Sequence, residues 1–181
     1  MSLKEEKMVS TTFNNLSDEK QTKIRRALLK EFSSEPLATA QVAPIVKTAG
    51  IARGAFYKYF DDLTDAYKYL YGVAMRDIHS EINNETGGQF QPQFYLDQVK
   101  AFVQGARDSE YFGLIKMHLM KNESLISQGS VDPATVTAPE WATMILSHEA
   151  IKQIIINPDS QARVMNHLSD ALNLLAGKEH A

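Results

Sequence analysis

The sequence contains no cysteine, and its purely apolar runs are short. The absence of cysteine excludes a disulfide framework and thiolate metal sites, and it is typical of a protein from the reducing cytoplasm. Apolar runs such as Ile154-Ile155-Ile156 fall far below the ~20 residues that a membrane-spanning helix needs. The N-terminal stretch MSLKEEKMVSTTF carries acids and has no apolar h-region, so we expect no signal peptide. These absences predict a cytoplasmic protein that does not associate with a membrane.

Sequence signals of catalysis are also missing. The histidines form no H-x-x-x-H pair, and the cysteine-free chain has no zinc-binding spacing. There is no glycine-rich phosphate loop and no G-x-S-x-G nucleophile elbow. We therefore expect no catalytic residue, no metal ligand and no cofactor, and we interpret the protein as a non-enzyme.

The net charge of −3 is unevenly distributed along the chain. Residues 20–60 contain eight bases and two acids, a local charge of +6. Residues 85–181 contain seven bases and eleven acids, a local charge of −4. A basic N-terminal part on an acidic body is typical of a DNA-binding protein with a separate domain that does not touch DNA.

Hydrophobic periodicity predicts an all-α protein. The composition, 44% hydrophobic, allows a packed core, and the apolar residues recur at helical rather than strand spacing. Ser17 is a good N-cap for the first helix, and Pro36 lies just past its end. Further helices are expected at about 40–49, 52–59, 64–83, 92–107, 110–122, 140–156 and 159–176, with a weaker segment around 123–138.

Residues 45–60, IVKTAGIARGAFYKYF, have the pattern of a helix-turn-helix. An apolar helix runs into Gly50, which supplies the flexible backbone of a tight turn. In the short helix that follows, Phe56 and Phe60 lie one turn apart on the inner side. This leaves Arg53, Tyr57 and other polar side chains for the outer side. A short helix with such side chains fits the major groove of DNA.

This stretch resembles the DNA-binding domain of tetracycline-repressor-type (TetR-family) transcriptional regulators. The family pattern is a helix ending in phenylalanine, then approximately T-V-x-x-I-A-x-x-A-G-V-S-x-G-x-F-Y-x-Y-F. The resemblance runs from Leu28 to Tyr71, about a quarter of the chain. The matching residues are Phe32, Val42, Ile45, Ala49-Gly50-Ile51, Gly54, Phe56-Tyr57 and Tyr59-Phe60.

The resemblance implies which side chains contact DNA. The hydroxyls of Tyr57 and Tyr59 would contact phosphates, and Arg53 and Lys58 would reach base edges or phosphates. Small residues between them would let the helix backbone approach the groove closely. The expected DNA-binding residues are Gln41, Ala52, Arg53, Gly54, Ala55, Tyr57, Lys58 and Tyr59.

The chain departs from the family pattern at three positions. The family usually has Ser or Thr at the positions of Gln41 and Ala52, and often a lysine at the position of Leu63. Contacts to DNA phosphates are therefore expected to contribute less to the affinity for DNA than they do in typical members of the family. For Tyr57 and Tyr59, an alternative interpretation is a partly buried core tyrosine.

The sequence predicts three segments. Residues 1–16 are expected to form a flexible N-terminal arm. Residues 17–84 would form a three-helix DNA-binding domain with a long fourth connecting helix, and residues 85–181 a helical effector-binding and dimerisation domain. The boundary is placed at Glu85–Gln89, the clearest linker in the chain.

Two sets of residues in the C-terminal part have an expected role. The resemblance implies that the last two helices form a four-helix bundle with a second copy and that the middle helices line an effector cavity, although ordinary core packing is an alternative for each set. The expected dimer residues are Ile151, Ile154, Ile155, Leu168, Leu172 and Leu175. The expected ligand residues are Phe102, Tyr111, Met117 and His118.

Together these features predict a ligand-responsive repressor that binds a palindromic DNA operator as a homodimer, with an unknown small molecule as effector. The alternative is a constitutive DNA-binding or protein-interaction dimer without an effector.

Overall fold

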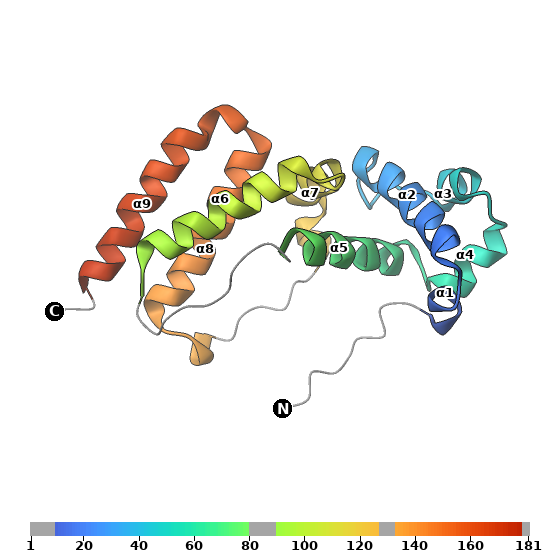
Figure 1. Cartoon of the computed structure of the whole chain (residues 1–181), viewed down its shortest axis with the longest axis horizontal. Helices are drawn as coiled ribbons and strands as arrows, with labels where there is room; N and C mark the ends of the chain where they lie inside the picture. The colour runs from blue at the N-terminus through green and yellow to red at the C-terminus, as the bar shows by residue number, and fades with distance from the viewer. Residues whose placement is uncertain (1–9, 80–89, 127–132, 179–181) are drawn as a thin grey trace. The chain divides into compact units, whose positions relative to one another are not determined.

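All regular structure in the computed structural model is helical over the residues it describes, which are 10–79, 90–126 and 133–178 (Figure 1). This confirms the all-α prediction. None of the helices in these ranges combines the length and the apolarity needed to cross a membrane. The α-helices are α1 (Thr11–Asn14), α2 (Asp18–Ser34), α3 (Val42–Ala49), α4 (Arg53–Tyr59), α5 (Leu63–His79), α6 (Pro92–Asp108), α7 (Phe112–Met117), α8 (Ala138–Ile156) and α9 (Gln161–Lys178).

Packing divides the chain into two compact units. Unit 1 contains the chain up to Asp77 together with Glu110–Ile126, and unit 2 contains Ile78–Ser109 together with the chain from Ser127 onward. The sequence predicts that residues 110–126 belong to the C-terminal domain, whereas in the structure they pack with the N-terminal helices. The predicted linker Glu85–Gln89 lies outside the described residues.

The predicted flexible arm needs a correction for residues 10–16. Ser10 caps α1, where its side chain accepts a hydrogen bond from the Phe13 amide at 3.3 Å. The Phe13 ring is fully buried (0% exposed), and it lies 5.3 Å from the Phe60 ring. This segment is ordered because it covers the aromatic core beneath α4. Residues 1–9 lie outside the described part of the chain.

In unit 1, α2 lies at the centre of the packing. Its predicted apolar stripe, Ile24, Leu28 and Phe32, is fully buried. α3 and α7 both pack against it. The contact with α7 is close, because a Cβ added to Gly113 would lie 3.0 Å from the Ser33 Cβ. The predicted helix at 110–122 is not α-helical throughout: α7 ends at Met117, and a π-helical turn, η1 (His118–Asn122), follows it directly.

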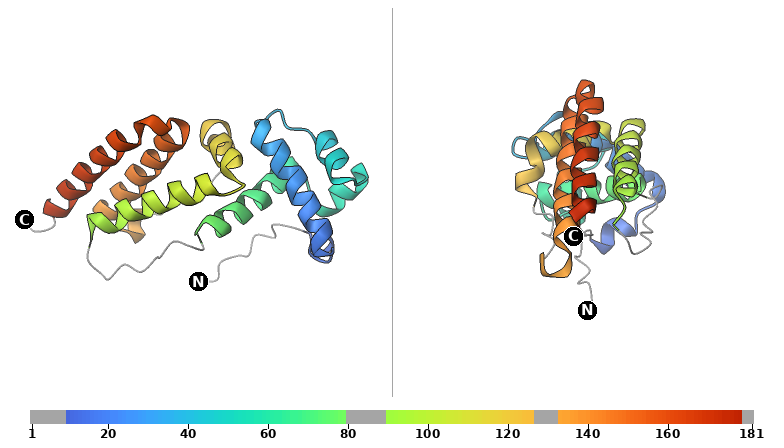
Figure 2. Two further views of the ribbon diagram at one scale, coloured as in Figure 1. Left: turned by 45° about the horizontal axis from the view of Figure 1, so that its top comes forward. Right: turned by 90° about the vertical axis from the view of Figure 1, so that its left-hand side faces the viewer.

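In unit 2, α8 and α9 form the predicted antiparallel hairpin, which Figures 1 and 2 show in different views. The break between the helices is η4 (Pro158–Ser160), where Ser160 Oγ donates to the Asn157 carbonyl at 2.6 Å. α6 packs against both helices of the hairpin. Thr137 and Glu140 form a capping box at the start of α8, which fixes where that helix begins.

Gly50 forms the turn of the helix-turn-helix. Its backbone is left-handed (φ 67°, ψ 36°), the one positive φ among the described residues. This conformation lets the Ile51 amide donate to the Val46 carbonyl at 3.1 Å, which closes the end of α3. The predicted role of Gly50 is confirmed.

Replacing Gly50 with alanine should lower the free energy of unfolding by about 1–2 kcal/mol, because an L side chain is strained in this backbone conformation. No atom lies within 4 Å of the added Cβ, so the cost is conformational rather than steric. Gly54→Ala is the matched control, since its Cβ also meets open space but its backbone is helical. It should raise the free energy of unfolding by about 0.5–1 kcal/mol. Urea unfolding measures both, and the same sign for the two would contradict this account.

Candidate nucleic-acid interface

An aromatic cluster on its inner side fixes the orientation of α4. Phe56 and Phe60 are buried as predicted, with ring centroids 5.4 Å apart. Phe60 also lies 5.7 Å from the ring of Tyr69 on α5, and Phe13 of α1 contacts both rings. The inner side of α4 is therefore fixed by core packing, while Arg53, Gly54, Tyr57 and Lys58 are exposed.

The open face of α4 presents polar and basic side chains. Arg53, Tyr57 and Lys58 are all exposed, and Tyr57 is 49% exposed despite its large ring. Arg53 Nη2 donates to the Tyr57 hydroxyl at 3.3 Å, and the guanidinium carbon lies 5.8 Å from the centre of the Tyr57 ring. The guanidinium and the hydroxyl are thus presented together on one side of the helix, as donors for phosphate or base-edge acceptors.

The remaining expected DNA-binding residues differ in exposure. Gln41, Ala52 and Gly54 are exposed, whereas Ala55 and Tyr59 are half-buried. The Tyr59 ring packs edge-on against Phe13 at 5.8 Å. This placement favours the alternative interpretation of Tyr59 as a partly buried core tyrosine, and it leaves Tyr57 as the exposed hydroxyl.

Neither Gln41 nor Ala52 makes a side-chain cap at the N-terminus of its helix. At the start of α3 an acid from α2 takes part of this role, because Glu31 Oε1 accepts a hydrogen bond from the Gln41 amide at 2.9 Å. The C-terminal end of α4 is bound by Ser10, whose hydroxyl donates to the Lys58 carbonyl at 2.7 Å. Sequence reasoning missed Ser10 and Glu31; the S-T-T-F pattern at residues 10–13 was the one available signal for Ser10.

The acids that follow α4 are used to cap α5. Asp62 Oδ1 accepts from the Asp65 amide at 2.7 Å, and Asp65 Oδ2 accepts from the Asp61 amide at 3.0 Å. Burial, together with the neighbouring charges of Asp61 and Asp62, raises the pKa of Asp65. The negative charge beside α4 therefore has a structural origin in the start of the next helix.

The four expected ligand residues are split between the two units. Phe102 lies on α6 in unit 2, where its ring is 5.3 Å from that of His79. Tyr111, Met117 and His118 belong to unit 1. Across the described ranges, no three His, Asp or Glu side chains are grouped so that they could hold a metal ion.

His118 is part of a buried polar cluster rather than exposed to a cavity. It is 1% exposed, its Nδ1 lies 3.0 Å from the Tyr67 hydroxyl, and its ring stacks on Tyr71 at 4.1 Å. Burial raises the pKa of Tyr67, so this hydroxyl stays neutral. Asn122, one turn further along η1, accepts from the Leu37 amide at 2.9 Å. The cluster thereby joins α5 and η1 to the loop that leads into α3.

The expected dimer residues lie mostly inside unit 2. Ile154, Ile155, Leu168 and Leu172 are 0–4% exposed in the single chain, while Ile151 and Leu175 are half-buried. The four buried side chains form the core between the hairpin helices, which is the alternative that the periodicity left open. The exposed large apolar side chains of the hairpin are Trp141, Met144, Ile145, Leu146, Ile156 and Leu174.

Replacing Tyr67 with phenylalanine should lower the free energy of unfolding by about 1–3 kcal/mol, because it removes the buried hydrogen bond between the Tyr67 hydroxyl and His118 Nδ1. Tyr57→Phe is the matched control: it removes the same hydroxyl from an exposed ring and should change stability by about 0.5 kcal/mol or less. Thermal or urea unfolding measures the difference. Equal effects of the two substitutions would show that the Tyr67–His118 contact does not stabilise the fold.

Comparisons with known proteins support the fold. No protein-family model and no curated protein sequence matches this chain. Among solved structures, it is similar to a TetR family transcriptional regulator from Chloroflexus aurantiacus J-10-FL, with 19% sequence identity and a TM-score of 0.56. The similarity covers 94% of this chain and 98% of that one. The protein therefore has the fold of a TetR-type regulator.

Proposed function

We propose that the protein is a DNA-binding transcriptional regulator in which α3 and α4 contact double-stranded DNA. The observation that carries the proposal is the exposed pair Arg53 and Tyr57, held together on the open face of a short helix after a left-handed glycine turn. A helix of this kind enters the major groove, while the preceding helix lies across the backbone. The basic surplus of residues 20–60 adds attraction for the phosphates.

The proposed active form is a homodimer. A DNA-binding helix-turn-helix protein generally reads two half-sites about one helical turn apart, which requires two recognition helices. Support comes from α8, which carries apolar side chains on its exposed face as well as its buried face. Trp141 (44% exposed) and Ile145 (49% exposed) lie one helical turn apart on that outer face. Exposed apolar patches of this kind mark interaction surfaces, and a second copy of the hairpin offers a matching one.

The proposed control is repression that a small-molecule effector relieves. An effector can act only if it binds one arrangement of the protein more tightly than the other, so it must favour the arrangement that does not fit the operator. Glu31 accepts a hydrogen bond from the Gln41 amide and Asn122 from the Leu37 amide, both just before α3, and these bonds are a route by which such a preference reaches the DNA-binding helices.

Arg53→Ala and Tyr57→Ala should each weaken binding to a duplex from upstream of the protein's own gene by about 1–3 kcal/mol, because each removes a donor from the proposed contact. Lys100→Ala, which removes an exposed positive charge from α6, is the control and should bind as the wild type does. Fluorescence anisotropy over a range of salt concentrations measures the affinities. The wild-type affinity should fall steeply with salt. Wild-type affinity in both α4 variants would mean that another face contacts DNA, and no binding even to sequences selected from a random library would reject the proposal.

Trp141→Glu combined with Ile145→Glu should convert the protein to monomers without loss of helix content, because both side chains lie on the surface of the single chain. Ala101→Glu adds one such charge at an exposed position of α6 and should leave the dimer intact. Leu172→Glu, by contrast, buries a charge in the core and should unfold unit 2, at a cost of about 4 kcal/mol or more. Sedimentation and circular dichroism separate these outcomes. A double variant that still sediments as a dimer would place the interface elsewhere.

A further inference from the structure

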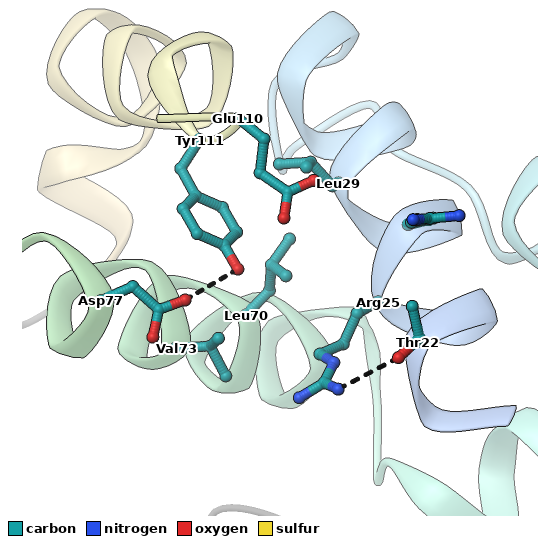
Figure 3. Close-up of a pocket in the computed structure, with 9 residues that line it drawn as sticks. Thr22, Arg25, Leu29, Leu70, Val73, Asp77, Glu110 and Tyr111 are labelled. Atoms are coloured by element: carbon teal, nitrogen blue, oxygen red, sulfur yellow. Dashed lines mark hydrogen bonds between the residues drawn. The ribbon is translucent and has the colours of Figure 1, made fainter. Parts of the chain in front are cut away.

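Unit 1 contains a pocket of about 290 Å³ between α2, α5 and the start of α7 (Figure 3). Its volume is at the low end of ligand pockets, which are typically about 300–1,000 Å³, so it suits a small molecule. Each helix contributes side chains at helical spacing, which places them on one face. The lining residues are Thr22, Arg25, Arg26 and Leu29 from α2, Leu70, Val73 and Asp77 from α5, and Glu110 and Tyr111 before α7.

The two ends of the pocket carry opposite charge. In Figure 3, Arg25 with Thr22 and Asp77 with Tyr111 lie at opposite ends, and Leu70 and Val73 lie between them. Arg25 Nη2 donates to Thr22 Oγ1 at 3.4 Å, a long bond that uses one of the five guanidinium donors. Arg26 adds a second positive charge from the same helix.

The acidic end is built around Asp77 and Glu110. The Tyr111 hydroxyl donates to Asp77 Oδ2 at 3.1 Å. Burial, together with the neighbouring Asp77 and Glu110 charges, raises the pKa of Tyr111 to about 12, so the phenol remains a neutral donor that holds the carboxylate in place. Carboxylates fixed in this way accept hydrogen bonds from an ammonium group.

The spacing of the charges restricts the ligand. A simple anion would be repelled by the acidic end, and a simple cation by the basic end. In an α-amino acid the two charges are adjacent, whereas Arg25 and Asp77 lie at opposite ends of this pocket, with Leu70 and Val73 between them. A ligand that reaches both ends therefore carries its two charges at opposite ends of a chain of several carbons.

We propose that this pocket binds a linear ω-aminocarboxylate. Its carboxylate lies at Arg25, its ammonium group lies at Asp77 and Glu110, and its methylene chain lies between these two ends of the pocket. Such a ligand would be the effector of the proposed regulator, so its biological role rests on the proposed function. Binding itself is measured without DNA, and a failure of either hypothesis is therefore distinguishable from a failure of the other.

The test is calorimetric titration of the full chain with 5-aminopentanoate and 6-aminohexanoate. At least one should bind with half-saturation at or below about 1 mM, an affinity in keeping with its few atoms. Hexanoate and hexylamine each lack one charge of 6-aminohexanoate. Each should bind about tenfold or more weakly than the zwitterion, because one set of charge-assisted hydrogen bonds is lost.

Arg25→Gln and Asp77→Asn should each weaken binding of the tighter probe by about tenfold or more. Glu110→Gln is a further variant at an exposed position, and it covers the case in which Asp77→Asn disturbs folding. Arg163→Gln removes an exposed arginine from α9 and should bind as the wild type does. The proposal is overturned if neither probe gives saturable heat up to about 10 mM. It is also overturned if hexanoate or hexylamine binds as well as the zwitterion, or if all folded pocket variants retain wild-type affinity.

Discussion

The packing of Phe60 is the constraint on which the rest of unit 1 depends. This ring follows α4 directly, and it contacts Phe13 of α1, Phe56 of α4 and Tyr69 of α5 at centroid distances of 5.3–5.7 Å. Because one ring touches three helices, the rotation of α4 about its axis is fixed by core packing. Arg53 thus points outward because the aromatic residues on the other side of α4 are buried. Aromatic pairs of this kind stabilise the fold beyond the contribution of the apolar area that they bury.

Local patterns in the sequence are sufficient to predict the helix-turn-helix. Gly50 was recognisable because a tight turn between helices needs a residue that tolerates positive φ, and Phe56 and Phe60 because their spacing matches one helical turn. The burial of Phe13 and His118 could not be predicted in the same way. Phe13 packs against Phe60, more than forty positions away in the sequence. His118 is hydrogen-bonded to Tyr67 on α5. Long-range contacts of this kind leave no periodic signal.

The hairpin of unit 2 shows a different limit of sequence reasoning. Periodicity identifies a buried face when the other face is polar, as it did for α2. On α8 apolar side chains occur on the exposed side as well as on the buried side, so the pattern predicts a helix but not which side packs against its own chain. The expected dimer residues Ile154 and Ile155 turned out to be core, while Trp141 and Ile145 are exposed. Apolar side chains gathered on an exposed helix face mark an interaction surface, and this is the physical ground for proposing a partner on α8.

The grouping of α7 and η1 with unit 1 also bears on how regulation could work. Residues 110–126 are distant in sequence from the helix-turn-helix. The Asn122 side chain nevertheless accepts a hydrogen bond from the Leu37 amide in the loop that leads into α3. α2 in turn holds the start of α3 through Glu31 and lines the pocket through Arg25. A ligand in the proposed pocket would therefore act on the same helix that positions α3. Regulation then requires only that the ligand prefer one of two arrangements of α2, and no signal needs to cross from unit 2.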